Sequence, residues 1–155
     1  MRPPAEIHSI QPTVSSSQCT DFSSEKEFWA AFIQDLKSCG FSLTIVSPFI
    51  TNDATWKLFS QLKELRTKGV AIRVFTRPRE EHQNRYGFNL AYARLQKLGV
   101  EVKTVGKIHQ KLAIIDAFIC FEGSVNILGF NDSKEHMRRF QGTGAKELLG
   151  QFNLE

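Results

Sequence analysis

Apolar residues recur along the chain at two spacings, one typical of helices and the other of strands. Three segments have apolar residues every three or four positions and end at a glycine, which predicts helices over about 24–40, 53–69 and 84–99. Ser24 and Glu27 have the spacing of a capping box at the start of the first helix. Asn52 or Asp53 is expected to cap the second.

Short runs rich in β-branched and apolar residues lie between these segments and after them. Three runs follow the helices and two more form a hairpin: 41–47, 70–76, 100–105, 110–115 and 118–121. Weaker helical patterns follow at 131–140 and 144–152. The repeated alternation of helix and strand predicts an α/β fold with a mixed, mainly parallel β-sheet flanked by helices on both faces.

The composition is that of one globular domain, with 41% hydrophobic and 23% charged residues. The N-terminal residues 1–20 are rich in proline and serine, so we expect a flexible tail there and a single domain over 21–155. The formal net charge of +4 fits a polyanionic partner such as nucleic acid but does not require one.

The cysteines are odd in number and lack the CxxC spacing of a zinc site. We therefore expect Cys19, Cys39 and Cys120 to be reduced thiols in a cytoplasmic protein, with no metal and no cofactor. The chain has no apolar run of about 18 residues, and its N-terminus lacks the apolar core of a secretory signal. No stable membrane insertion is expected.

One stretch, 109–126 (HQKLAIIDAFICFEGSVN), combines several reactive and polar residues at fixed spacings. They are His109, Lys111, Asp116, Gly123, Ser124 and Asn126. Average residue usage would produce this pattern in about 2 chains per million of this size. On a strand, His109 and Lys111 point to the same face, whereas Asp116 has the opposite parity and is expected to support the strand end or a turn.

These side chains offer an imidazole, an ammonium group, a hydroxyl and an amide. The imidazole is a nucleophile or proton carrier, and the other groups are donors suited to phosphate oxygens. The missing side chain of Gly123 is expected to let the backbone approach a ligand closely. The alternative is that His109 and Lys111 are solvated surface residues.

In open α/β sheets, ligands bind beyond the carboxyl ends of the strands. Ser47-Pro48-Phe49 follows one such end, and Arg77 and Arg79 follow another. We expect both segments at the rim of the site, where the arginines would bind a nucleic-acid backbone. The alternative for the arginines is a solvated loop.

The pattern at 109–126 resembles the signature of the phospholipase D superfamily of phosphodiesterases. The following residues, with Asn126-Ile127-Leu128 and Glu135-x-Met137-Arg138-Arg139, resemble especially the phospholipase D-like nuclease domains attached to DNA/RNA helicases and some restriction-type nucleases. The resemblance implies a phospholipase D-like catalytic domain that needs no metal ion, because lysine and asparagine side chains supply the charge stabilisation.

The resemblance also implies a role for each matching residue. His109 would attack phosphorus and form a phosphohistidine, while Lys111 and Asn126 would hold the nonbridging oxygens. Ser124 would support the phosphate or the loop. Glu135 would accept a hydrogen bond from the histidine and fix its tautomer.

The implied mechanism needs two histidines, but the chain has one motif. The remaining histidines are His8, His82 and His136, and none is followed two residues later by a lysine. We therefore expect a twofold homodimer that brings His109 of both copies into one shared active site.

The expected function is that of a metal-independent phosphodiesterase, specifically an endonuclease that cleaves DNA or RNA. A helicase would be its partner or a fused domain. Two alternatives stay open. One is a phospholipase-type or other phosphodiesterase, and the other is a noncatalytic nucleic-acid-binding or scaffold module on the same fold.

Overall fold

The computed structural model describes residues 19–131 and 134–152. Within these ranges, seven strands form one sheet. The strands are β1 (Thr20–Phe22), β2 (Ser42–Val46), β3 (Ala71–Thr76), β4 (Glu101–Thr104), β5 (Leu112–Ile115), β6 (Ile119–Gly123) and β7 (Met137–Gln141). The helices are α3 (Glu25–Lys37), α4 (Asn52–Lys57), α5 (Phe59–Thr67), α6 (Arg85–Lys97) and α7 (Thr143–Gly150), with a short 3-10 helix η1 (Arg79–Glu81).

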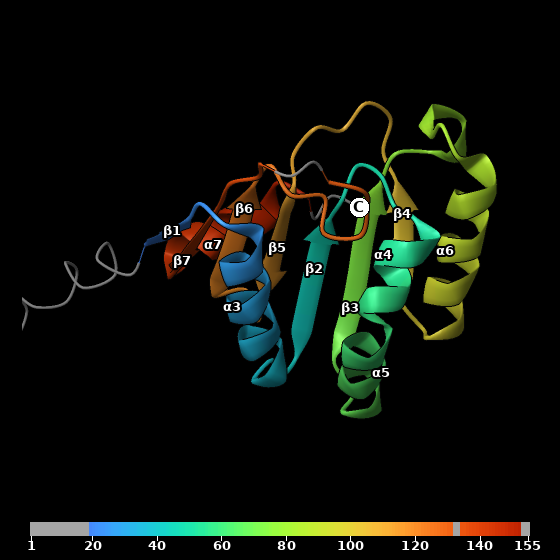
Figure 1. Ribbon diagram of the computed structural model, residues 1–155. Coiled ribbons are helices and arrows are strands. Elements are labelled where there is room, and N and C mark those ends of the chain that lie inside the picture. Colours follow the sequence, from blue (N-terminus) through green and yellow to red (C-terminus); the bar gives the residue numbers. More distant parts are fainter. Residues whose placement is uncertain (1–18, 132–133, 153–155) are drawn as a thin grey trace, which may run out of the picture.

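The strands lie in the order β1-β7-β6-β5-β2-β3-β4 (Figure 1). Strand β3 pairs in parallel with β2 and β4, whereas the other four neighbouring pairs are antiparallel. The mixed α/β sheet is confirmed, and its parallel part is smaller than the sequence suggests. Parallel neighbours need a crossover of about a dozen residues. Helices α4, α5 and α6 supply such crossovers, and the described chain has no helix between β4 and β7.

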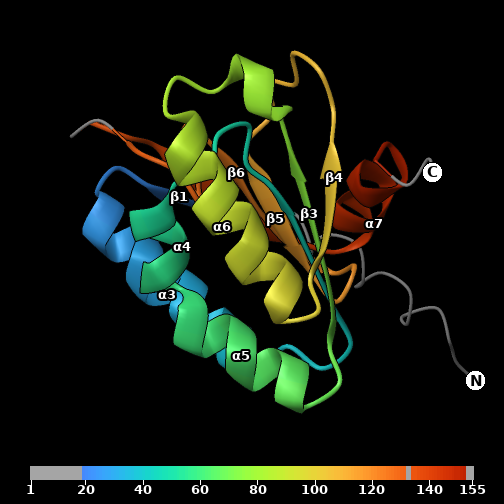
Figure 2. The ribbon, with the colours of Figure 1, turned by 90° about the vertical axis from the view of Figure 1, so that its right-hand side faces the viewer.

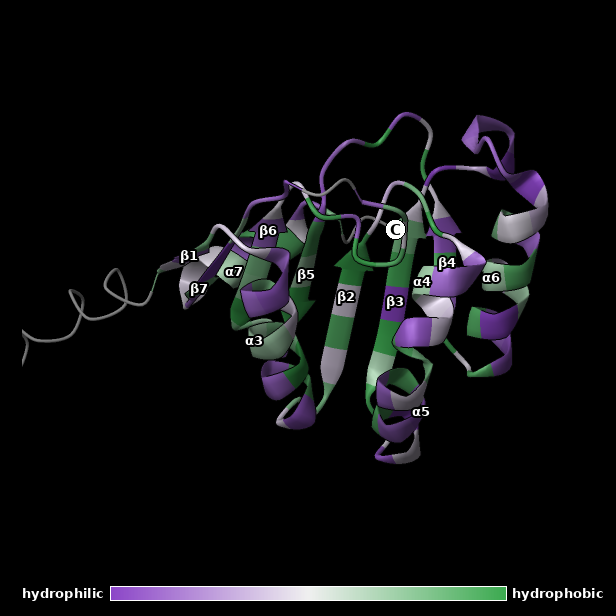
Figure 3. Cartoon of the chain, in the orientation of Figure 1, coloured by the Kyte–Doolittle hydropathy of each residue, from purple (hydrophilic) through white to green (hydrophobic). Residues whose placement is uncertain are grey.

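Helices cover both faces of the sheet, as predicted: α3, α4, α5 and α6 lie on one face and α7 on the other (Figure 2). In the larger core, the rings of Phe28 and Phe32 lie 5.6 and 5.3 Å from the ring of Phe121 in β6. A smaller core under α7 includes Ala145 and Val46. Hydrophobic residues follow the strands and polar residues mark the outer helix faces (Figure 3).

The predicted helix signals are largely confirmed. Ser24 caps α3, since its hydroxyl accepts the N–H of Glu27 at 3.3 Å. Gly69 and Gly99 follow α5 and α6 with a φ of 88°, a left-handed conformation that favours glycine. The cap of α4 is neither Asn52 nor Asp53. The preceding residue, Thr51, caps this helix, since its hydroxyl oxygen accepts the N–H of Ala54 at 3.1 Å.

Two other local predictions are wrong. Gly40 does not end α3, which stops at Lys37; the Gly40 N–H instead donates to Asp116 at 2.8 Å. The described residues of the segment predicted as a helix over 131–140, which are 131 and 134–140, form no helix. The second half of the segment belongs to β7, an extended strand between β6 and β1, because pairing on both edges outweighs the weak helical pattern.

The short strand β1 was missing from the sequence prediction, because its three residues follow a polar segment. Thr20 pairs with Arg139, so the last residue of the tail predicted over 1–20 already belongs to the sheet. The rest of that prediction concerns mainly residues 1–18, which lie outside the described ranges.

The cysteine side chains are free thiols, as predicted. Burial raises the pKa of Cys39 and of Cys120 to about 12, and the nearby Asp116 and Glu122 carboxylates add to the two shifts respectively. Both thiols therefore stay protonated at neutral pH and are poor nucleophiles. Among the residues described, no helix is both long and apolar enough to cross a membrane.

Candidate active site

His109 lies in the loop that leads into β5, and its side chain is exposed. The strand starts only at Leu112, so the expectation that His109 and Lys111 lie on one face of a strand is wrong. The two residues are nevertheless close. The Lys111 Nζ donates to the backbone carbonyl of His109 at 3.3 Å, which holds the ammonium group beside the histidine.

Arg77 contacts the histidine directly. Its Nη2 lies 3.0 Å from Nδ1 of His109, although 32 positions separate the two residues. Its Nε donates to the carbonyl of Ile108 at 2.8 Å, and its guanidinium lies 4.9 Å from the centre of the Phe49 ring. Arg77 therefore lies at the centre of the candidate site, deeper than the rim position predicted for it, whereas Arg79 is exposed on η1.

The sheet topology explains why these residues meet. Val46 at the end of β2 pairs with Leu112 at the start of β5, and Leu112 pairs with Glu122 near the end of β6. The loops after β2, β3 and β6 and the loop before β5 therefore leave the sheet at the same edge. This edge carries Arg77, His109 and the predicted donors, and we call it the catalytic edge.

Asn126 lies in the loop after β6 and is half-buried. Its backbone N–H donates to Oδ1 of Asn131 at 2.6 Å, and its carbonyl accepts Nδ2 of Asn131 at 2.9 Å. Its own side-chain oxygen Oδ1 is buried without a hydrogen-bond partner among the described residues. A buried amide oxygen without a donor is uncommon in folded proteins.

Hydrogen bonds hold this loop against the loop after β2. The Ser47 hydroxyl accepts the N–H of Leu128 at 3.1 Å and donates to the Phe49 carbonyl at 2.8 Å. The Thr51 N–H donates to the Leu128 carbonyl at 2.8 Å. A Cβ on Gly129 would lie 2.4 Å from the Phe49 carbonyl oxygen, so glycine is needed there. The predicted rim segment 47–49 thus positions the Asn126 loop.

Ser124 is hydrogen-bonded to the backbone of His136, the residue just before β7. Its hydroxyl accepts the N–H of His136 at 2.8 Å and donates to the His136 carbonyl at 3.2 Å. Of the two roles left open for Ser124, this geometry favours support of the loop. The role predicted for Gly123 is wrong: a Cβ there would lie 2.2 Å from the His136 carbonyl oxygen, so glycine makes room for the neighbouring backbone and not for a ligand.

Asp116 lies at the opposite end of β5 from His109, since it follows Ile115, the last residue of the strand, whereas His109 precedes Leu112, the first. Its carboxylate accepts the N–H groups of Gly40, Phe41 and Ser42 at 2.8, 2.7 and 2.9 Å. Burial alone would raise the pKa of Asp116, but these N–H donors together lower it below 3.8. The geometry agrees with the structural role predicted from its parity.

Glu135 lies half-buried two residues before β7. Within the ranges that the structure covers, no hydrogen bond joins Glu135 to His109, and Nδ1 of the histidine is engaged by Arg77. The orienting role of Glu135 stays a prediction.

His82 was not among the predicted site residues, yet it supports the catalytic edge from inside. It is only 6% exposed, its Nε2 accepts the N–H of Ile50 at 3.2 Å, and its Nδ1 lies 3.1 Å from the carbonyl of Pro78. Burial lowers the pKa of His82, so the ring is neutral and joins the loops after β2 and β3. In the sequence, the position of His82 five residues after Arg77 could have indicated that it lies near the site.

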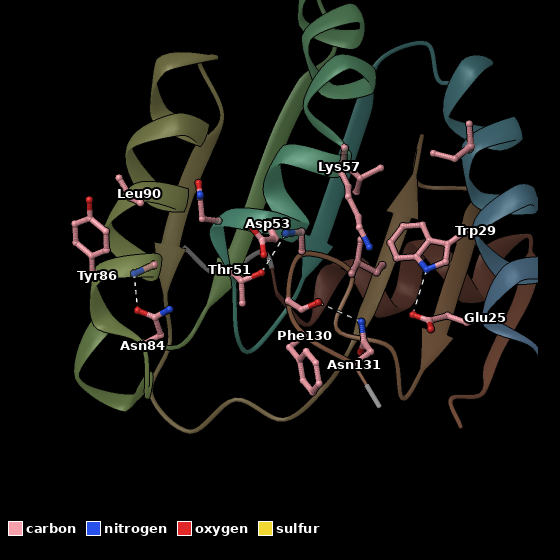
Figure 4. Close-up of a pocket in the computed structure, with 17 residues that line it drawn as sticks. Glu25, Trp29, Thr51, Asp53, Lys57, Asn84, Tyr86, Leu90, Phe130 and Asn131 are labelled. Atoms are coloured by element: carbon pink, nitrogen blue, oxygen red, sulfur yellow. Dashed lines mark hydrogen bonds between the residues drawn. The ribbon is translucent and has the colours of Figure 1, made fainter. Parts of the chain in front are cut away.

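A groove of about 790 Å³ lies beside the catalytic edge, between α3, α4, α6 and the loop after β6 (Figure 4). Trp29, Lys57, Tyr86 and Phe130 line it, together with Asn131, whose side chain holds the Asn126 loop. His109 and Lys111 are not among its lining residues. The groove therefore adjoins the candidate site and is separate from the residues that would perform chemistry.

The fold is that of a phospholipase D-like domain. The sequence model of one family, described as "Cardiolipin synthase, PLD-like domain", matches residues 32–149. The chain belongs to the phospholipase D superfamily, whose enzymes have phosphodiesterase-type functions. A comparison with curated protein sequences gives no significant match.

Solved structures share this fold. Nuc from Salmonella typhimurium, a phospholipase D family member, is 15% identical with a TM-score of 0.67, over 86% of this chain and 90% of its own. NucT from Helicobacter pylori is 18% identical with a TM-score of 0.69, over 86% of this chain and 91% of its own. Phosphatidylserine synthase from Haemophilus influenzae is 11% identical with a TM-score of 0.72, over 90% of this chain and 38% of its own.

Proposed function

We propose that the chain is a nuclease that hydrolyses phosphodiester bonds of DNA or RNA without a metal ion, through a covalent phosphohistidine on His109. The observation that carries the proposal is the meeting of His109, Lys111 and Arg77 at the catalytic edge. An exposed imidazole beside two cationic donors combines a nucleophile with groups that bind phosphate oxygens.

The reaction has two steps. In the first, a ring nitrogen of His109 attacks phosphorus and the leaving oxygen departs with a proton from a second histidine. In the second, that histidine takes a proton from water, which attacks phosphorus and breaks the P–N bond, so His109 is restored. Lys111, Asn126 and Arg77 would stabilise the negative charge that develops on the nonbridging oxygens.

The second histidine is best supplied by another copy of the chain. His82 is buried, neutral and hydrogen-bonded on both ring nitrogens. The His136 side chain lies 3.8 Å from Asp21 of β1. His8 is outside the described residues. A twofold dimer would place His109 of each copy in one site, as the resemblance implies.

The positive charge of the chain and of its catalytic edge favours a polynucleotide as substrate. The chain carries a net charge of +4, and Arg77 and Arg79 lie together at the end of β3. Phosphate backbones are bound mainly through such cationic groups. A helicase as a partner or fused domain, and a cytoplasmic location, remain part of the proposal.

Three similarities favour the alternatives. The matching family description and the phosphatidylserine synthase favour a phospholipid diester as substrate. The archaeal chromatin protein TrmBL2, described with a novel mode of DNA binding, is 11% identical with a TM-score of 0.56 over 92% of this chain, and favours a noncatalytic DNA-binding module.

The test is cleavage of labelled single- and double-stranded DNA and RNA in EDTA, with protein whose mass in solution is measured by sedimentation. We expect a dimer that cleaves at least one polynucleotide, no cleavage by His109→Ala, and full cleavage by His136→Ala, which removes an imidazole that is 57% exposed. A monomer that stays active at high dilution would refute the shared site. A dimer that cuts no polynucleotide would refute the nuclease, and phospholipid diesters would then be tested.

A further inference from the structure

The two most exposed aromatic rings of the described chain lie along one groove. Tyr86 on α6 is 73% exposed, and Phe130 in the loop after β6 is 75% exposed. Both line the groove of about 790 Å³ beside the catalytic edge, and Trp29 of α3 lies on the side opposite Tyr86 (Figure 4). Single exposed aromatic residues are common on protein surfaces, but rings gathered in one groove of this size are typical of a ligand site.

The three rings differ in how they are held. The Trp29 ring packs 4.9 Å from the ring of Phe28 in the core, and its Nε1 donates to Glu25 at 3.3 Å, so it forms a fixed wall. Within the described ranges, Tyr86 and Phe130 make no contact with another aromatic ring or with a cation. Their faces are therefore available to stack on a flat ligand.

The charges of the groove do not suit a phosphate backbone. Glu25 and Asp53 are acidic, and Lys57 is the one basic residue among the described residues that line the groove. Nucleic-acid backbones are bound mainly by an excess of cationic groups. Such groups lie at the catalytic edge, where Arg77 and Lys111 flank the histidine. The groove is therefore better suited to the uncharged part of a polynucleotide, which is its bases.

The groove and the catalytic edge share the loop after β6. Asn131 lines the groove, and its side chain binds the backbone N–H and carbonyl of Asn126, the proposed phosphate ligand. Phe130 is the residue immediately before Asn131. A strand whose phosphate lies against Asn126 can therefore place a neighbouring base beside the Phe130 ring.

We propose that this groove is a subsite for unpaired bases, in which Tyr86, Phe130 and Trp29 stack on bases of a single strand next to the scissile phosphate. Every base offers a flat face for such stacking. In a duplex the bases are stacked on one another and must first be extruded. The substrate class is therefore single-stranded DNA or RNA. This inference rests on the proposed nuclease function and names the form of its substrate.

An acyl chain would suit the groove less well than bases. Asp53 and Lys57 are exposed on α4 and have no hydrogen bond or ion pair within the described ranges. Hydrocarbon would remove water from both groups without replacing its hydrogen bonds. The edges of bases carry both donors and acceptors, so they can pair with a carboxylate and an ammonium group.

The first test measures binding in the His109→Ala background, so that no substrate is cut. Fluorescence anisotropy compares labelled oligothymidylate with an abasic oligomer of the same length. We expect oligothymidylate to bind about 10-fold tighter or more, and Tyr86→Ala and Phe130→Ala each to weaken its binding about 10-fold. Binding of the abasic oligomer should not change. Tyr86→Phe keeps the ring and should bind oligothymidylate as before.

Phe118→Ala is the matched control. Phe118 is 50% exposed and lies in the turn after β5, at the end of the sheet far from the catalytic edge, so its loss should change no binding. Equal binding of oligothymidylate and the abasic oligomer would overturn the proposal, as would equal losses in Phe118→Ala and Phe130→Ala. It would also be overturned if the Tyr86 and Phe130 variants kept oligothymidylate binding but lost binding to phosphatidylglycerol vesicles.

The second test, cleavage, separates the subsite from the proposed function. We expect the protein to cut a single strand about 10-fold faster or more than the duplex of the same sequence, and Phe130→Ala to reduce this preference mainly by raising KM. Equal cleavage of both forms would contradict the subsite and leave the nuclease function intact. Binding that depends on Tyr86 and Phe130, without cleavage of any polynucleotide, would refute the nuclease and leave the subsite standing.

Discussion

The carboxylate of Asp116 accepts the backbone N–H of Phe41 at 2.7 Å, although the two residues are 75 positions apart. With the bonds from Gly40 and Ser42, this contact joins the start of β2 to the turn after β5. Asp116 has a φ of 54°, a left-handed conformation that aspartate tolerates better than most residues. The motif aspartate therefore fixes the register of two central strands, far from the catalytic edge.

Asp116→Ala should reduce stability and leave the chemistry intact. We expect the free energy of unfolding to fall by about 2 kcal/mol, because three N–H groups lose a charged acceptor. The kcat of the folded variant should match the wild type. Urea unfolding and cleavage assays measure both quantities, with Glu147→Ala on the exposed face of α7 as the control. A variant of full stability but no activity would place Asp116 in the catalytic machinery.

Gly123→Ala should be strongly destabilising. The new Cβ would lie 2.2 Å from the His136 carbonyl oxygen, so β6 and β7 would have to separate. We expect a loss of about 3 kcal/mol or more in urea unfolding. Gly150→Ala is the matched control, since a Cβ there meets nothing within 4 Å and alanine favours the helix. Equal stability of the two variants would contradict the close approach of β6 and β7.

Substitutions of Ser124 and Asn126 should have different effects, because Ser124 supports a loop and Asn126 is a proposed site residue. Ser124→Ala removes both hydroxyl hydrogen bonds to His136, so we expect it to cost about 1 kcal/mol of stability and little of kcat. Asn126→Ala removes the amide donor proposed for the nonbridging oxygens. The Asn126 side-chain oxygen has no partner among the described residues, so we expect unchanged stability and a kcat about 100-fold lower. Unfolding and cleavage assays measure both effects. A loss of kcat in Ser124→Ala and a loss of stability in Asn126→Ala would contradict this assignment of roles.

His82 should make stability depend on pH below about 6.5. Burial lowers the pKa of His82 from 6.5 in the folded chain, so the unfolded chain binds more protons in the interval below that value. The stabilisation is fully present above pH 6.5 and is lost as the pH falls through the folded pKa, with a slope of at most about 1.4 kcal/mol per pH unit.

Urea unfolding between pH 5 and 7 measures this dependence. His82→Gln should flatten the curve, because glutamine keeps a donor and an acceptor but does not titrate. A slope that persists in His82→Gln would show that another group causes it.

The sequence predicts most of the fold because local signals and tertiary structure agree there. Ser24 caps α3 through its hydroxyl, and Gly69 adopts the left-handed conformation expected after a helix. Strand β7 escapes prediction because pairing with β6 and β1, not local preference, makes 137–141 extended.

The candidate site is only partly readable from the sequence. The spacing of His109 and Lys111 predicts the candidate site, and the odd offset of Asp116 predicts its structural role. The contact between Arg77 and His109 cannot be read in this way, because the parallel pairing of β2 with β3 and the antiparallel pairing of β2 with β5 bring the two loops together. The role of Gly123 was mistaken because a backbone neighbour, and not a ligand, occupies the space beside it.

The central claim is that His109 becomes covalently attached to phosphorus. It is tested most directly by mixing the dimeric protein with a labelled oligonucleotide, quenching in alkali within the first turnover, and locating the label by peptide mass spectrometry. We predict a phosphoramidate on the peptide that contains His109, and none in His109→Ala. An active protein that cleaves the oligonucleotide in EDTA without forming any adduct, or with an adduct on another residue, would contradict the account.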